Sequence, residues 1–206
     1  MRLPELPRPE RYELDLWVDP ARKAFRGEVE ISLEVEAGTR SIELHAVDLE
    51  LGAASARDAE GDLRVVRIRA NPKRETATLV LDRPLAGTRA SLRIAWKGAL
   101  RADLRGLYLA RSGKRRYAAT QLEAADARRF FPCFDEPDKK ARFALRVTTP
   151  TRNQVVSNGA IAGVSTRGRN KTVRFAETPK LSTYLIALVV CELESSRAVL
   201  VGSTPI

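Results

Sequence analysis

The chain has 206 residues, of which 44% are hydrophobic, so it is long enough and apolar enough to bury a core. Its formal net charge is +10, from 36 Lys and Arg against 26 Asp and Glu, which makes nucleic acid and anionic surfaces partners to consider. The single histidine excludes a complete zinc motif with two histidines and disfavours catalytic sites of the Ser-His-Asp or Cys-His type.

Alternation of apolar and polar residues dominates the chain. Between Phe25 and Glu36 every second residue is apolar or small and its neighbours are mostly charged, which predicts a strand with one buried face. Turn formers such as Asp19-Pro20 and Asn71-Pro72 separate such segments at the spacing of an antiparallel sandwich or barrel. The pattern predicts further strands at residues 12–18, 42–46, 64–70, 77–81, 92–96, 117–122, 143–147 and 173–175.

Two segments late in the chain have a different character. Residues 123–129 predict a short helical turn, and the apolar run 184–190 predicts a strand buried on both faces. No segment before residue 120 carries a helical apolar stripe, and no linker divides the chain. We therefore expect residues 1–206 to form a single all-β domain with an antiparallel fold.

The isolated reactive residues favour structural roles. His45 lies on the strand face opposite Ile42 and Leu44 and is expected to be structural rather than a metal ligand. Cys133 and Cys191 are too few for a disulfide framework and are expected to be buried thiols.

The densest stretch of the sequence is YAATQLEAADARRFFPCFDEPDKKARF, residues 117–143. It combines a strand edge, a turn, and a loop rich in aromatic residues and proline. Because a loop crossing a sandwich must satisfy its own polar groups, we expect its charges to pair internally. These charges are Asp126, Arg128, Arg129, Asp135 and Glu136.

Gln121 and Glu123 are candidates for substrate binding. Residues i and i+2 of a strand project from the same face, so the amide and the carboxylate point together. A carboxylate beside an amide suits the α-ammonium group of a peptide. The alternative interpretation of the same spacing is an exposed polar edge without a ligand.

The segment TQLEAADARRFFPCFDEPDKKARF resembles the signature of the aminopeptidase N family of zinc metallopeptidases, the gluzincins. The segments YELDLWVDP, FRGEVEISLEV, VVSNG and TPKLSTYLIALVVCELE match in the same order, so the resemblance covers almost the whole chain. Ala124, Gly159 and Cys191 depart from the residues common in that family. A branch of epoxide hydrolases carries glutamine where this chain has Glu123, so the resemblance favours a peptidase.

The resemblance implies a saddle-like antiparallel β-sandwich that precedes a thermolysin-like catalytic domain. It implies that Glu123 binds the free α-amine of a peptide substrate and that Gln121 lines the pocket for its first side chain. The family's zinc motif and its Gly-x-Met-Glu-Asn motif would both lie beyond Ile206. We therefore expect a truncated chain with no catalytic residue, metal or cofactor of its own, and zinc in the catalytic domain of a parent enzyme.

The expected partners are that catalytic domain and the N-terminus of a peptide. The basic clusters at residues 114–116 and 167–171 contain no aromatic residue for base stacking, so nucleic acid is not expected. The apolar run 184–191 is shorter than a membrane span and the first residues lack a signal-peptide core, so we expect a soluble cytoplasmic protein. Two alternatives remain: a non-catalytic scaffold module of the same fold, and an independent carbohydrate- or nucleic-acid-binding sandwich.

Overall fold

The structure is a computed structural model that describes residues 2–194, 199–202 and 204–205. No helix in this part of the chain has the length and apolar character that a membrane crossing requires. The elements are β1 (Arg8–Trp17), β2 (Ala24–Glu34), β3 (Ser41–His45), β4 (Leu49–Asp58), β5 (Gly61–Asn71), β6 (Thr76–Leu81), β7 (Arg89–Ala99), β8 (Gly106–Ser112), β9 (Arg115–Gln121), the 3-10 turn η1 (Ala127–Arg129), β10 (Arg142–Pro150), β11 (Gln154–Ser157), β12 (Ile161–Arg167), β13 (Asn170–Phe175), the 3-10 turn η2 (Thr183–Leu185), β14 (Leu188–Cys191), β15 (Leu200–Val201) and β16 (Thr204–Pro205).

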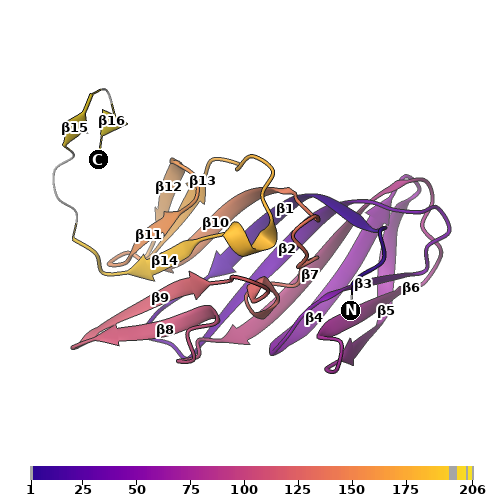
Figure 1. Ribbon diagram of the computed structural model, residues 1–206, viewed down its shortest axis with the longest axis horizontal. Coiled ribbons are helices and arrows are strands. Elements are labelled where there is room, and N and C mark those ends of the chain that lie inside the picture. Colours follow the sequence, from indigo (N-terminus) through magenta and orange to yellow (C-terminus); the bar gives the residue numbers. More distant parts are fainter. Residues whose placement is uncertain (1, 195–198, 203, 206) are drawn as a thin grey trace.

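Ten strands form a large twisted sheet in the order β12-β13-β10-β1-β2-β7-β4-β5-β6-β3 (Figure 1). Its neighbouring strands are antiparallel with one exception, the parallel pair of β1 and β10, in which Tyr12 lies opposite Phe143. The parallel pair arises because β10 follows β1 only after a long excursion of the chain and enters the sheet from the same end. The all-β sandwich class predicted from the sequence is confirmed, with this one parallel pair added.

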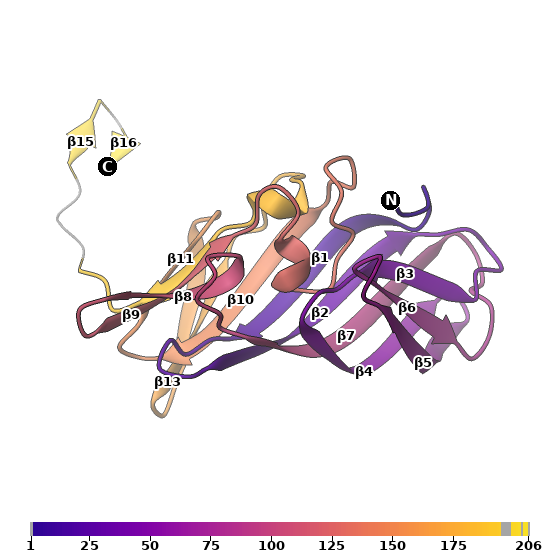
Figure 2. The same cartoon turned by 60° about the horizontal axis from the view of Figure 1, so that its bottom comes forward.

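A second sheet of four strands, in the order β11-β14-β9-β8, lies over one half of the large sheet (Figures 1 and 2). The other half, containing β3 to β6, extends beyond it and curls, which gives the molecule its saddle shape. The predicted turn at residues 123–129 is present as η1 and the turn before it.

The predicted strands are present except for the first part of the segment 184–190, and β2 shows why the pattern was informative. Its Val29, Ile31 and Leu33 are buried while their neighbours reach toward solvent, as one-sided burial requires. Strands β4, β8, β11 and β12 and the short strands β15 and β16 were not predicted. In β4 the Gly52-Ala53-Ala54 stretch lacks strong alternation, and β12 lies at a sheet edge where most of its side chains are exposed.

The prediction for residues 184–190 was wrong over its first part. Thr183–Leu185 form η2, Leu185 is 48% exposed, and only Leu188–Cys191 form a strand. The side chain of Asn158 explains the difference, because it donates to the carbonyl of Leu185 and accepts from the N–H of Ala187, both at 2.8 Å. These bonds satisfy backbone groups that a continuous strand would have paired with a neighbour.

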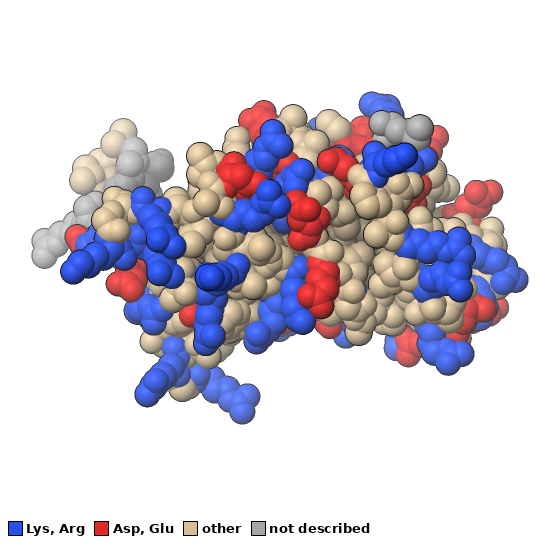
Figure 3. All heavy atoms as spheres, turned by 90° about the horizontal axis from the view of Figure 1, so that it is seen from below, with Lys and Arg blue, Asp and Glu red and all other residues tan. Residues whose placement is uncertain are grey.

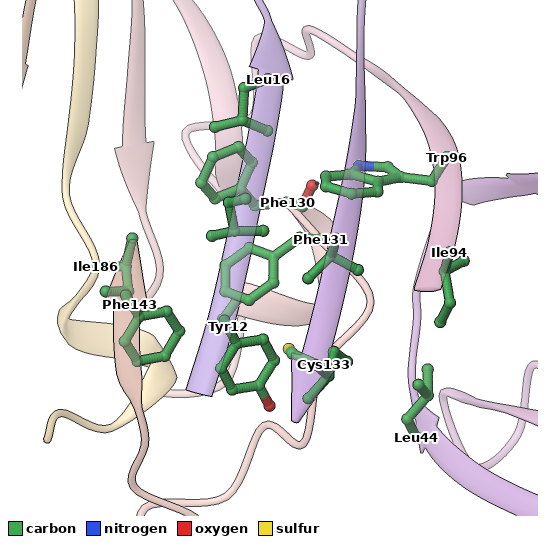
Figure 4. Packing of buried hydrophobic residues seen from close by; sticks show 14 of the residues in the cluster. Tyr12, Leu16, Leu44, Ile94, Trp96, Phe130, Phe131, Cys133, Phe143 and Ile186 are labelled. Carbon is green, nitrogen blue, oxygen red and sulfur yellow. Dashed lines mark hydrogen bonds between the residues drawn. The ribbon is translucent and has the colours of Figure 1, made fainter. Parts of the chain in front are cut away.

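Aromatic side chains fill the space between the sheets (Figure 4). Phe131 packs edge-on against Tyr12 and Phe130, at centroid distances of 5.9 and 5.3 Å. Tyr12 stacks on Phe143 at 4.8 Å, which joins the parallel strands β1 and β10. Because Phe130 and Phe131 come from the segment after β9, that segment is part of the core.

Candidate functional site

Residues 122–141, here called the bridging loop, lead from β9 to β10 and pack against the large sheet. Cys133 and His45 exchange two backbone hydrogen bonds, at 2.8 and 3.1 Å, which ties the loop to β3. The indole Nε1–H of Trp96 on β7 donates to the carbonyl of Phe130 at 2.9 Å. The loop is therefore held at buried positions and not only at its ends.

The five charged residues for which the sequence predicted partners, Asp126, Arg128, Arg129, Asp135 and Glu136, all have them, either within the bridging loop or in neighbouring segments. Arg128 donates from Nε to Asp135 at 2.9 Å, and Arg129 donates from Nε to Asp126 at 2.9 Å. Glu136 accepts the backbone N–H of Leu3 at 2.6 Å. Burial opposes the charge on Arg128, but its hydrogen bonds raise the pKa of the guanidinium group.

His45 has a structural position. Its Nδ1 atom accepts the backbone N–H of Asp135 at 3.1 Å, and its side chain is buried. Burial and the nearby Arg128 lower the pKa of His45 to about 4, so the imidazole is neutral at pH 7. The imidazole therefore fastens the bridging loop to β3.

Cys133 and Cys191 are both free thiols, and both are buried, as predicted. Burial raises the pKa of each, well above the ordinary range in the case of Cys133. A buried thiol with a raised pKa is a poor nucleophile, so both residues contribute to packing.

Gln121 and Glu123 lie at the point where β9 enters the bridging loop. Gln121 is the last residue of β9, Glu123 is in the following turn, and both are exposed while Leu122 between them is buried. The peptide bond between Glu123 and Ala124 is cis. Within the described residues, neither side chain takes part in a hydrogen bond or an ion pair, in contrast to the paired charges that follow them.

Hydrogen bonds and close packing hold the turn that carries Glu123. The N–H of Asp126 bonds to the carbonyl of Leu122 at 2.9 Å, and the Asp126 carboxylate accepts from Arg129. Gly106, which lies opposite Gln121 in the β8–β9 register, has a φ of +64° and packs against Arg129 so closely that an added Cβ would lie 2.7 Å from the Arg129 Cβ. The position of Glu123 is therefore set by packed neighbours rather than by a free loop.

A row of apolar side chains crosses the outer face of the small sheet. Val156 lies opposite Val189, Val189 opposite Ala119, and Ala119 opposite Tyr108, so one residue comes from each of the four strands. Their sequence neighbours, such as Ala118 and Val190, are buried in the core, whereas the row is partly exposed and Val156 reaches 51%. Gln121 is two residues from Ala119 on β9 and extends the same face.

The row was not predicted from the sequence. Its members come from strands that are far apart in the chain, and two of those strands, β8 and β11, were not expected at all. The sequence indicates an outward-facing row only in β9, where every second residue faces outward and Gln121 is the last of these residues.

The described residues contain no group of side chains suited to zinc. Among the described residues no group of three His, Cys, Asp or Glu side chains could hold a metal ion. The lone imidazole, His45, uses its Nδ1 lone pair to accept a backbone N–H inside the core. We therefore assign no catalytic step through zinc to these residues.

Comparison with known proteins identifies the domain family that this chain matches. A family model for the Peptidase M1 N-terminal domain matches residues 8–185. Aminopeptidase M1-A of Oryza sativa subsp. japonica is 36% identical over an alignment of 197 positions, which covers 92% of this chain and 22% of that protein. The alanine/arginine aminopeptidase of Saccharomyces cerevisiae is 34% identical, over 87% of this chain and 22% of that protein. Aminopeptidase N of Acetobacter pasteurianus is 33% identical, over 94% of this chain and 55% of that protein. The chain thus spans about a fifth of the length of most of these relatives.

Proposed function

Because the chain belongs to the Peptidase M1 N-terminal domain family, we propose that it is one domain, the N-terminal substrate-anchoring domain of a zinc aminopeptidase that removes N-terminal residues from peptides. The observation that carries this proposal is the position of Glu123. It is an exposed carboxylate without a partner among the described residues, on a turn that the surrounding packing fixes.

In this role Glu123 accepts hydrogen bonds from the α-ammonium group of the peptide. A carboxylate and an ammonium group form a charge-assisted pair, which is stronger than a neutral hydrogen bond. Gln121 borders the pocket for the first side chain and offers either a donor or an acceptor. The contribution to catalysis is alignment, because a fixed ammonium group determines which peptide bond reaches the reacting centre.

The bond-breaking groups belong, in this proposal, to a catalytic domain outside this chain, which supplies zinc and its activated water. In this proposal the catalytic domain docks on the outer face of the small sheet. The apolar row on that face, formed by Tyr108, Ala119, Val156 and Val189, supports this choice. A partly exposed apolar face beside Gln121 and Glu123 is suited to a permanent domain interface. Docking there places the two polar residues at the edge of the joint cleft.

The experiment is a kinetic comparison in the protein produced from the full reading frame. Glu123→Ala should lower kcat/KM for aminoacyl-anilides by about 10- to 100-fold, because one charged hydrogen-bonding group and the alignment it gives are lost. Glu34→Ala removes an exposed carboxylate on β2 and should leave kcat/KM unchanged. An unchanged kcat/KM for Glu123→Ala would overturn the assignment.

A ligand pair tests the charge recognition itself. The wild-type protein should bind an amino-acid amide more tightly than the same molecule without its α-amine, and Glu123→Gln should reduce that difference. A full-length protein that has neither zinc nor hydrolytic activity would instead support a non-catalytic scaffold.

A further inference from the structure

Three turns converge at the end of the sandwich opposite the β3–β6 half. Arg116, from the β8–β9 hairpin, donates to the carbonyl of Ala21 in the β1–β2 turn at 3.2 Å. Arg152, from the β10–β11 turn, donates to Asp19 of the same β1–β2 turn at 3.4 Å. The three turns border a hollow of about 340 Å³. It is lined by Pro20 and Ala21 of the β1–β2 turn and by the polar residues Lys114, Arg115, Arg116, Arg152, Asn153 and Glu192.

Positive charge exceeds negative charge around this hollow. Arg115 pairs with Glu194 at 2.7 Å and Arg152 with Glu192 at 3.1 Å, both on the surface. Within the described residues, Arg116 has only a carbonyl as its acceptor and Lys114 has no ion pair.

The next hairpin adds more positive charge. The N–H of Thr151 bonds to the carbonyl of Arg169 at 3.0 Å, which brings the β12–β13 hairpin beside the β10–β11 turn. Arg167 and Arg169 of that hairpin are exposed, as are Arg22 and Lys23 of the β1–β2 turn. Figure 3 shows Lys and Arg side chains gathered at this end of the molecule with few acidic neighbours. Such a concentration of one charge attracts anions.

The lining side chains suit phosphate groups in particular. The guanidinium group presents parallel N–H donors that match phosphate oxygens, and three arginines face one hollow. The surface pairs with Glu192 and Glu194 are worth at most about 1 kcal/mol each, so a multivalent anion can replace them. The lining includes no aromatic side chain on which a base could stack, which favours recognition of phosphate over that of a nucleobase.

We propose that this hollow binds an anion carrying two or more phosphate groups, through Lys114, Arg115, Arg116 and Arg152. The volume equals that of roughly ten water molecules in the liquid, which leaves room for more than one phosphate group. The anion is either a free oligophosphate or the phosphorylated headgroup of a lipid. The site does not depend on the proposed peptidase role, because it shares no residue with Gln121 and Glu123.

The test measures binding of inorganic triphosphate to the full-length protein by calorimetry. A second arm measures binding to phosphatidylcholine vesicles with and without phosphatidylinositol bisphosphate. Lys114→Ser combined with Arg116→Ser should weaken the binding seen in either arm by about tenfold or more, because two phosphate-binding cations are lost. Arg67→Ser combined with Arg69→Ser removes the same charge from exposed positions on β5 and should change binding by far less.

The outcomes distinguish a free anion from a lipid headgroup, and binding at this hollow from an effect of net charge. Triphosphate binding that is lost in the first variant identifies a free anion, and binding to the phosphoinositide vesicles alone identifies a lipid headgroup. An equal loss in both variant pairs shows a net-charge effect and overturns the proposal, as does the absence of binding in both arms. Lys114→Ser by itself removes a residue without an ion pair and provides a milder variant if the double variant is unstable. Glu123→Ala should bind triphosphate like the wild type, which keeps this result separate from the peptidase test.

Discussion

The Nδ1 atom of His45 accepts the backbone N–H of Asp135 at 3.1 Å, so a single imidazole on β3 fixes the centre of the bridging loop. The Asp135 carboxylate in turn accepts from Arg128 at 2.9 Å and from the hydroxyl of Thr183 at 2.6 Å. Asp135 thereby connects β3, the start of the bridging loop and η2. These contacts determine the stability of the segment that carries Glu123 at its beginning.

The stability of the fold should depend on the titration of His45. Its pKa is about 4 in the folded protein, mainly because of burial, against an ordinary value of about 6.5. The unfolded chain therefore binds more protons at this residue between pH 4 and 6.5, and the stabilisation is fully present above pH 6.5 and lost as the pH falls through 4. We expect this residue to reduce the free energy of unfolding by roughly 2 to 3 kcal/mol across that window, measured by denaturant titration.

His45→Asn is the matched variant, because its amide oxygen can accept the Asp135 N–H and does not titrate. The difference between wild type and variant isolates His45 from the carboxylates that titrate in the same range. If the free energy of unfolding falls equally in both proteins between pH 6.5 and 4, the predicted contribution of His45 is wrong.

Gly27 should not tolerate a side chain. It lies opposite Trp96 in the β2–β7 register, and an added Cβ would lie 2.7 Å from the indole and 2.9 Å from the carbonyl oxygen of Asp15. Gly27→Ala should lower the free energy of unfolding by about 1 to 3 kcal/mol through overpacking. Gly52→Ala is the control, because the nearest atom to its new Cβ is 3.5 Å away. Equal effects in the two variants would argue against steric overlap with Trp96.

The Arg128–Asp135 pair should contribute far more to the free energy of unfolding than a surface pair does. The side chains are 11% and 1% exposed, so loss of Arg128 leaves a buried carboxylate with one donor fewer. Arg128→Met should cost about 3 to 5 kcal/mol of unfolding free energy. Arg64→Met breaks an exposed pair with Asp82 and should cost less than about 1 kcal/mol. Similar losses at the two sites would show that burial does not set the difference.

Lys139 should hold the N-terminal segment against the bridging loop. Its buried ammonium group donates to the carbonyls of Pro4, Glu5 and Pro7, at 2.9 Å for Pro4 and 3.3 Å for Pro7. Lys139→Met leaves these acceptors without their donor, and we expect amide exchange over residues 3–8 to accelerate by about tenfold or more.

The neighbouring residue provides the control for this measurement. Lys140 is exposed, and Lys140→Met should leave exchange at the N-terminus unchanged. Unaltered exchange in Lys139→Met would show that other contacts, such as the 2.6 Å bond from Leu3 to Glu136, suffice to hold the segment.

The sequence by itself determined the fold class, most strand positions and the pairing of charges in the bridging loop. Alternation in β2 is a local property, and burial on one face follows from it directly. The charges from Asp126 to Glu136 lie close together along the chain, so their need for partners could be inferred without coordinates. The projection of Gln121 and Glu123 from one strand face stays a prediction, because β9 ends at Gln121 and Glu123 lies in the following turn.

Tertiary structure decided what depends on distant partners. The parallel pairing of β1 with β10, the row from Tyr108 to Val156 and the basic hollow each join residues from separate parts of the chain. Apolar character predicted a strand through residues 184–190, but Asn158, some 27 residues earlier, bonds to the backbone there and ends it. Periodicity reports which side of a segment is buried, whereas its neighbours are set by packing and by hydrogen bonds that the chain forms only once it has folded.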